Sequence, residues 1–181
     1  MKKLIGLTFL VLLTAIFMSC ARVAPKPGIK VGTMTVEEHA TLRNYPDLRD
    51  YCGEYSPQAM TPGTQTIDCE VPLLPRIQTD FGWGAKDSTT LDSNWSAMTW
   101  ELYLDGQQIN LDEFEQWSRS GRTLAGNPAQ GRGWTLDLVD LSPGEHILRL
   151  LWRSETPIDD GFDIYPPGTY ESDVNFTVLE Q

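Results

Sequence analysis

Short segments in which apolar and polar residues alternate constrain this chain most strongly. In one of them Trp100, Leu102 and Leu104 alternate with more polar residues, and Asp105-Gly106 follows directly. Alternation with a period of two predicts a half-buried strand, and Asp-Gly between two such runs predicts a tight hairpin turn. We therefore expect a β-hairpin centred on Asp105-Gly106.

The same alternation recurs later in the chain. Further strands are expected at residues 134–141, 146–152 and 170–178. Residues 111–117 are expected to form a short helical turn, and residues 118–133, rich in Gly, Ser and Asn, to form a loop. Short strands separated by turn residues predict a β-sandwich.

Residues 73–181 resemble immunoglobulin-like and fibronectin type III-like domains. Residues 141–148, with Ser142-Pro143-Gly144 before His146, are similar to the start of their penultimate strand, and residues 167–178 are similar to their closing strand. The resemblance implies an antiparallel sandwich that acts as a binding or spacing module. It also places His146 where related domains have a corner tyrosine that bonds to nearby backbone. Leu148 occupies the position of the second cysteine of the antibody disulfide, so the kinship it implies is architectural.

The amino terminus has the three parts of a secretory signal. Lys2 and Lys3 precede an apolar run over residues 4–18, which is too short for a membrane span of about 20 residues. Residues 17–20 resemble the lipobox of bacterial lipoproteins, which implies a signal peptide over residues 1–19 and acylation (diacylglycerol, palmitate) of Cys20. Ordinary secretion and an uncleaved anchor are the alternatives. The resemblance implies a protein in the bacterial cell envelope, anchored to a membrane through an N-terminal lipid and facing away from the cytoplasm.

The charge of the chain excludes one class of partner. From Cys20 onward it has 12 basic and 25 acidic residues, a net charge of −13, and most of this charge lies in residues 70–181. Nucleic acid is bound chiefly by Lys and Arg that neutralise phosphates, so we expect no nucleic-acid partner. A surface protein or a glycan remains open as a partner.

Two further cysteines, Cys52 and Cys69, form an even pair in an exported chain, which predicts a disulfide. Before them, residues 20–34 contain Pro and Gly and are expected to form a flexible tether. Thr35 and Glu38 have the spacing of a capping box and predict a short helix. We expect residues 35–72 to form this helix and an irregular lead-in stapled by the disulfide.

Two groups of residues are candidate binding sites. Asp159, Asp160 and Asp163 surround a glycine in a connection between strands, and calcium prefers such oxygen ligands, although a solvated acidic loop is the simpler interpretation. Trp83, Trp95 and Trp117 lie near expected turns, and exposed aromatic rings can stack on sugars. Large aromatic rings that close the edge of a sandwich are the alternative.

No catalytic motif or constellation is present in the sequence, and we assign no catalytic residue. His39 is expected to be solvated in the short helix, and His146 to be structural. The sequence therefore predicts a mainly β protein, an Ig-like antiparallel β-sandwich over residues 73–181 with an irregular, disulfide-stapled N-terminal extension. We expect a lipid-anchored, non-catalytic binding or structural module. A carbohydrate-binding module is one alternative; an accessory subunit of a hydrolase, or a cryptic cell-surface hydrolase, is another.

Overall fold

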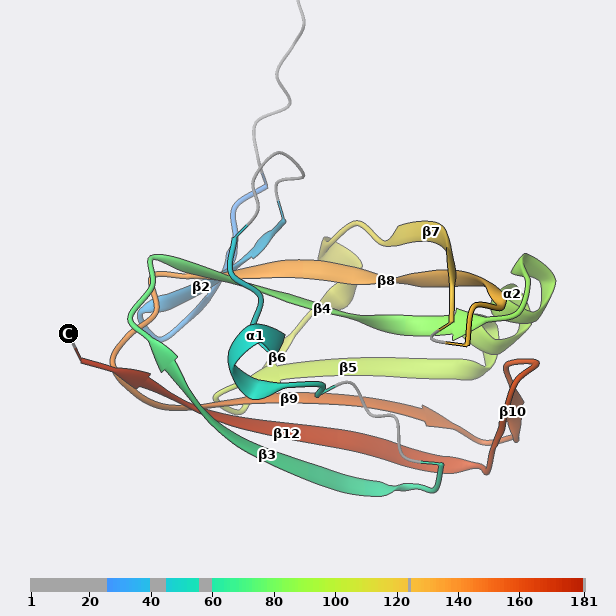
Figure 1. Cartoon of the computed structure of the whole chain (residues 1–181). Coiled ribbons are helices and arrows are strands. Elements are labelled where there is room, and N and C mark those ends of the chain that lie inside the picture. The colour runs from blue at the N-terminus through green and yellow to red at the C-terminus, as the bar shows by residue number, and fades with distance from the viewer. Residues whose placement is uncertain (1–25, 40–44, 56–59, 124, 181) are drawn as a thin grey trace, which may run out of the picture.

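The computed structural model describes residues 26–39, 45–55, 60–123 and 125–180, whose longer strands form two five-stranded sheets that face each other (Figure 1). The first sheet has the order β1-β2-β8-β4, with β7 also paired to β8: β1 (Ile29–Val31), β2 (Met34–Glu38), β8 (Pro128–Val139), β4 (Arg76–Ala85) and β7 (Trp117–Arg122). The second sheet has the order β3-β12-β9-β5-β6: β3 (Gly63–Pro72), β12 (Gly168–Leu179), β9 (Gly144–Ser154), β5 (Met98–Leu104) and β6 (Gln107–Ile109).

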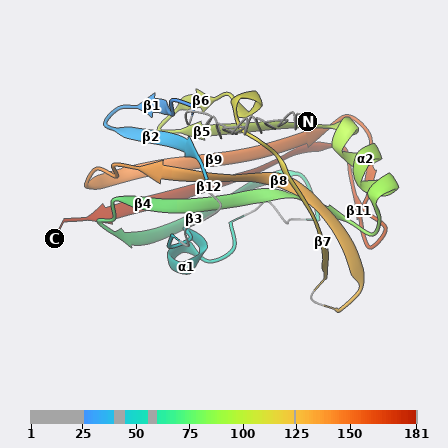
Figure 2. The ribbon, with the colours of Figure 1, turned by 90° about the horizontal axis from the view of Figure 1, so that it is seen from above.

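Shorter elements close the ends of the two layers. These are α1 (Arg49–Cys52), α2 (Ser88–Ala97), a 3₁₀ turn (Leu111–Glu113) and the small hairpin of β10 (Ile158–Asp159) and β11 (Ile164–Tyr165). Figure 2, seen from above, shows the hairpin of β7 and β8 projecting sideways from the layers. None of the helices in the described part of the chain combines the length and the apolar composition that a membrane crossing requires.

The strands form where the alternating pattern predicts them. In β9 the residues His146, Leu148, Leu150 and Trp152 are buried, and the residues between them face outward. The expected hairpin is confirmed: Leu104 pairs with Gln107, and Asp105 and Gly106 have φ of 50° and 78°. Asp-Gly favours this turn because both central residues need positive φ.

The space between the sheets is filled by apolar side chains with an unusual share of aromatic rings. Trp152 stacks on Tyr170 with 3.9 Å between ring centroids, and Trp83 packs edge-on against Trp152 at 5.1 Å. Such pairs add to the stabilisation from burial alone. Trp83, Trp152 and Tyr170 pack in one cluster with Leu91 of α2 and Ile158 of β10.

The amino-terminal part differs from the expectation. In place of a flexible tether through residue 34, β1 pairs with β2, and in place of a helix at Thr35, β2 pairs with β8. Met34 and Val36 are buried in the core, and this tertiary packing outweighs the local capping pattern. Residues 20–25 lie outside the described residues.

His39, expected to be solvated on that helix, instead follows β2 and contacts a buried carboxylate. Its Nδ1 lies 2.8 Å from the Asp137 side chain, which is fully buried and also accepts a hydrogen bond from Arg76 at 2.8 Å. The Arg76 guanidinium bonds to Glu37 as well. This cluster joins β2, β4 and β8 on the outer face of the first sheet, so we assign it a structural role.

The lead-in is partly regular and is stapled as expected. The Cys52–Cys69 disulfide is confirmed, with 5.0 Å between the Cα atoms. However, residues 63–72, expected to be irregular, form β3, which pairs in parallel with β12 along its full length. Residues 118–133, expected to be a loop, contain most of β7 and the start of β8. Their Gly and Ser residues resemble a loop locally, but they belong to a long hairpin.

Candidate functional site

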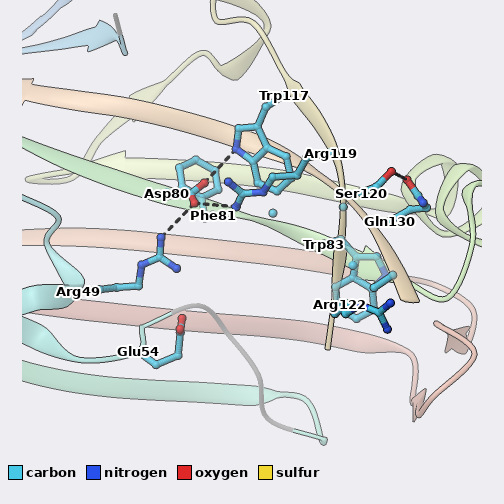
Figure 3. Close-up of a pocket in the computed structure, with 15 residues that line it drawn as sticks. Arg49, Glu54, Asp80, Phe81, Trp83, Trp117, Arg119, Ser120, Arg122 and Gln130 are labelled. Carbon is cyan, nitrogen blue, oxygen red and sulfur yellow. Dashed lines mark hydrogen bonds and ion pairs between the residues drawn. The ribbon is translucent and has the colours of Figure 1, made fainter. Parts of the chain in front are cut away.

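A cleft of about 290 Å³ lies on the outer face of the first sheet, where side chains of β7 reach past β8 toward β4 (Figure 3). Its walls come from β4, β7, β8 and the segment around α1. The residues that line it are Arg49, Glu54, Asp80, Phe81, Gly82, Trp83, Gly84, Trp117, Arg119, Ser120, Gly121, Arg122, Ala129, Gln130 and Gly131.

Asp80 is the central polar residue of this cleft. It lies on the outer face of β4, yet it is only 7% exposed because side chains from other segments cover it. Its Oδ2 accepts hydrogen bonds from Arg49 and Arg119, both at 3.0 Å, and its Oδ1 accepts one from Trp117 Nε1 at 2.9 Å. One buried carboxylate therefore fastens the α1 segment and β7 to β4.

Glycines make room for this arrangement. Gly82 and Gly84 on β4 pair with Gly133 and Gly131 on β8, so four neighbouring positions of the outer face have no side chain. A Cβ at Gly133 would lie 2.6 Å from the Trp117 ring and would also collide with the carbonyl oxygen of Phe81. Glycine within a strand often marks such a close approach.

Trp117 and Arg119 form a fixed pair above this glycine floor. The Arg119 guanidinium lies 3.9 Å from the centre of the Trp117 ring, a cation–π distance. The benzo edge of the same ring contacts Gly131 and Gly133. The ring is thus packed on more than one side, whereas the Arg119 side chain remains 61% exposed and can contact a ligand.

The α1 segment is held equally firmly against β4. Tyr55 is fully buried; its hydroxyl lies 2.7 Å from Thr79 Oγ1 and accepts a hydrogen bond from the Asp80 amide at 3.1 Å. Burial raises the pKa of Tyr55 above its ordinary value, with a further contribution from the charge of Asp47. Burial lowers the pKa of Arg49, but the hydrogen bond and charge of Asp47 outweigh burial and raise it overall.

The charge of the cleft is opposite to that of the rest of the molecule. The cleft is lined by three arginines, Arg49, Arg119 and Arg122, and by two acids, Glu54 and Asp80. Asp80 forms ion pairs with both Arg49 and Arg119. The whole chain has 25 acidic and 14 basic residues. The cleft therefore offers guanidinium donors, which suit carboxylate or phosphate groups.

The three tryptophans considered for sugar stacking do not form one exposed strip. Trp83 is only 8% exposed and packs in the aromatic core, and Trp95 packs against Trp100 and Trp134 at 5.7 and 5.2 Å. Trp83 and Trp95 therefore follow the alternative interpretation, packed aromatic rings, because β4 and α2 turn both rings inward. Trp117 does reach the outer face, but the Arg119 guanidinium lies over its ring, and Gly131 and Gly133 lie beside the edge of the ring.

The acidic turn considered for calcium uses its carboxylates on its own backbone. Asp159 accepts a hydrogen bond from the Gly161 amide at 2.8 Å, and Asp160 accepts bonds from the amides of Phe162 and Asp163 at 2.7 and 2.8 Å. Within the described ranges no group of three or more His, Cys, Asp and Glu side chains is arranged to hold a metal ion. Calcium binding at this turn stays a prediction.

His146 lies in a Ser-His-Asp arrangement that resembles a catalytic triad. Its Nδ1 is 2.8 Å from Asp105, and its Nε2 is 3.3 Å from the Ser142 hydroxyl. Nε2 is closer, at 2.9 Å, to the Ser142 carbonyl oxygen, which can only accept a hydrogen. Nε2 in this contact has no lone pair for the serine proton. The ring is 8% exposed and bonds to backbone as expected for a corner residue.

Sequence reasoning did not find Arg49, Asp80, Arg119 or the glycine floor. One signal was present: Gly-x-Gly occurs both at residues 82–84 and at residues 131–133, inside segments otherwise suited to strands. Paired glycines of this kind indicate that another group approaches the backbone closely. Cys20, the expected lipidation site, lies outside the described residues.

Comparisons with known proteins place the chain in no family. No family model and no curated protein matches it. Among solved structures it is similar to PbICP-C, in the structure of PbICP-C in complex with falcipain-2, with 12% identity, 67% of this chain and 93% of that chain covered, and a TM-score of 0.34. The cysteine protease inhibitor EhICP2 from Entamoeba histolytica has 12% identity and a TM-score of 0.31, with 66% of this chain and 96% of that chain covered. Plasmodium falciparum protein Pf12p has 7% identity and a TM-score of 0.27, with 70% of this chain and 45% of that chain covered. TM-scores this low carry no argument about function.

Proposed function

We propose that the protein is a non-catalytic binding module, anchored through a lipid on Cys20 in the bacterial cell envelope and binding its partner in the arginine-lined cleft. The apolar run that ends at Cys20 supports the anchor. The Cys52–Cys69 disulfide fits an oxidising space outside the cytoplasm. The observation that carries the binding role is the cleft itself.

Several features of the cleft support a preformed binding surface. Arg49 and Arg119 come from segments far apart in the chain, and both bond to the same buried carboxylate of Asp80. Charged side chains held in this way lose little conformational freedom when a ligand arrives. The cleft also concentrates positive charge on an acidic molecule, which is difficult to explain as a requirement of solubility.

We infer an immunoglobulin-like order for the two sheets. The neighbours β4-β8-β7 and β5-β9-β12 correspond to strands B-E-D and C-F-G of that fold. Trp100 lies on the strand that corresponds to C, and His146 bonds back to Ser142 at the start of the strand that corresponds to F. We assign binding to the outer face of β4, β8 and β7, which carries the cleft.

A hydrolase role is less well supported than binding. The one histidine beside both a serine and an aspartate, His146, is nearly buried and has both ring nitrogens against oxygen atoms. His39 contacts Asp137 in a cluster that joins three strands. Both arrangements fit structural roles.

Site-specific photo-crosslinking in the native host tests the binding role. A photoreactive side chain at Ser120, which lines the cleft, should give a discrete adduct; the same group at Ile147, exposed on the second sheet, should not. Arg119→Glu should suppress the adduct from position 120. Equal labelling from the two positions, or no adduct from position 120, would reject the cleft as the binding surface.

The anchor has a separate test. Cys20→Ser should move the protein from the membrane fraction to the soluble fraction and remove the mass of the acyl groups from the intact chain. Retention of Cys20→Ser in the membrane would reject the lipid anchor and favour an uncleaved signal helix. The crosslinking result does not depend on this outcome.

A further inference from the structure

The geometry points to an extended peptide with acidic side chains as the occupant of the cleft, added as a further strand along the edge of β4 between Asp80 and Lys86. This inference rests on the proposed function, because it names the partner of the same cleft. It is carried by the backbone edge of β4 and by the arginines beside it.

The edge of β4 that faces away from β8 is covered on both sides of a gap. At one end Gln78 donates to the Pro46 carbonyl at 2.8 Å and the Asp80 amide donates to the Tyr55 hydroxyl at 3.1 Å. At the other end the Lys86 amide donates to the Asp160 carbonyl at 2.8 Å. The even-numbered residues of β4 therefore direct their backbone groups away from β8.

Gly82 and Gly84 lie between these two covered ends and have the same parity. Within the described ranges, no hydrogen-bond partner is present for their outward amide and carbonyl groups. Gly84 is exposed, and both residues line the cleft. An open strand edge of this kind accepts an extended peptide through main-chain hydrogen bonds.

The length of the gap sets the length of the peptide. Six residue steps separate Asp80 from Lys86, which at about 3.3 Å per residue correspond to about 20 Å of strand. A peptide of about six residues would therefore fill it. Because side chains alternate along a strand, every second residue of the peptide would face the cleft.

The arginines select the side chains at those positions. Arg119 uses one nitrogen for Asp80 and lies over the Trp117 ring, yet its side chain remains 61% exposed. Arg122 is exposed, with one nitrogen on the Gly126 carbonyl. Carboxylates at alternate positions of the peptide would meet these guanidinium groups. An acidic glycan would satisfy the same charges, but it makes no use of the strand edge, and Arg119 already covers one face of the Trp117 ring.

Fluorescence polarisation with the full chain in detergent tests the inference. The probe is a labelled hexapeptide of alternating glutamate and valine, and the control probe replaces glutamate with lysine. Gly84→Pro removes the outward amide without breaking the β4–β8 ladder, and Gly84→Ala, whose Cβ would lie 3.7 Å from the Gln130 carbonyl, keeps that amide. Arg119→Glu removes a cleft cation, and Arg153→Glu on the second sheet matches its change in charge.

The acidic peptide should bind, and the lysine peptide should not. Gly84→Pro and Arg119→Glu should each weaken binding at least about tenfold, and Gly84→Ala and Arg153→Glu should change it less than about threefold. If Gly84→Pro fails to fold, a probe N-methylated at alternate amides replaces it and should bind at least about tenfold more weakly than the unmethylated peptide.

Two results would overturn the inference. One is failure of the acidic peptide to bind, and the other is binding unaffected by both Gly84→Pro and N-methylation. If polygalacturonate bound instead, with sensitivity to Arg119→Glu alone, the occupant would be a glycan and the cleft would remain a binding surface. Absence of the crosslink from position 120 would in addition reject the proposed function.

Discussion

Replacing Asp80 with alanine removes the group on which the cleft depends. Asp80 accepts hydrogen bonds from Arg49, Arg119 and Trp117, and a longer one of 3.3 Å from Thr135. The bond from half-buried Trp117 to a carboxylate is worth about 1.5 kcal/mol, and that from Thr135 about 0.5 kcal/mol. The arginine side chains are 35% and 61% exposed, so water screens both pairs and each contributes only about 0.5 kcal/mol.

The sum gives an expected loss of about 2–3 kcal/mol in the free energy of unfolding for Asp80→Ala. For a domain of this size the melting temperature should fall by roughly 5–10 °C. Asp92→Ala is the matched control, because Asp92 is exposed on α2 and, within the described residues, forms an ion pair with Arg132 only. The control should lose at most about 0.5 kcal/mol.

Urea unfolding followed by tryptophan fluorescence measures both losses. Asp80→Asn, which keeps the shape but not the charge, should lie between wild type and Asp80→Ala. If Asp80→Ala were as stable as Asp92→Ala, the carboxylate would not fasten β7 and the α1 segment to β4. The description of the cleft as preformed would then be wrong.

Three further perturbations test other parts of the structure. Gly133→Ala should lower the free energy of unfolding, measured in urea, by at least about 2 kcal/mol, because its Cβ would collide with Phe81 and the Trp117 ring. Gly121→Ala, at a position with open space, should cost less than about 1 kcal/mol. Equal costs for the two variants would refute the close approach of Trp117 to the glycines. Replacing Cys52 and Cys69 with serine should lower the free energy of unfolding by about 3 kcal/mol, and an unchanged urea midpoint would contradict the staple. Burial, with the charges of Asp160 and Asp163, raises the pKa of Tyr165 to about 12, above an unfolded value of about 10. The proton is bound more tightly in the folded state, so this stabilisation is complete below pH ~10 and is lost as the pH rises toward ~12, and Tyr165→Phe should flatten that part of the stability curve measured by urea unfolding.

The strands with regular alternation could be predicted because their burial depends on local pattern. In β9 and β12 every second residue faces the core, and the turn at Asp105-Gly106 needs the φ angles that these residues adopt readily. The pairing of Cys52 with Cys69 followed from there being two cysteines beyond the signal. These features need no knowledge of distant neighbours.

The cleft could not be predicted, because its residues meet only in the folded chain. Arg49, Asp80 and Arg119 lie on α1, β4 and β7, and each is an ordinary polar residue in its own segment. Residues 118–133 resembled a loop because their glycines serve the packing of Trp117, a contact that local pattern does not reveal. The same limit explains Thr35, whose capping pattern gives way to pairing with β8.

Amide hydrogen exchange at residues 80–86 would show whether a partner occupies the cleft. The exchange would be measured by mass spectrometry on the full chain, purified in detergent and, separately, in membranes of the native host. A partner bound in the cleft should slow exchange at Gly82 and Gly84 in the native membranes, with no change at Ile147 on the second sheet. Equal exchange at Gly82 and Gly84 in the two preparations would contradict binding in the cleft.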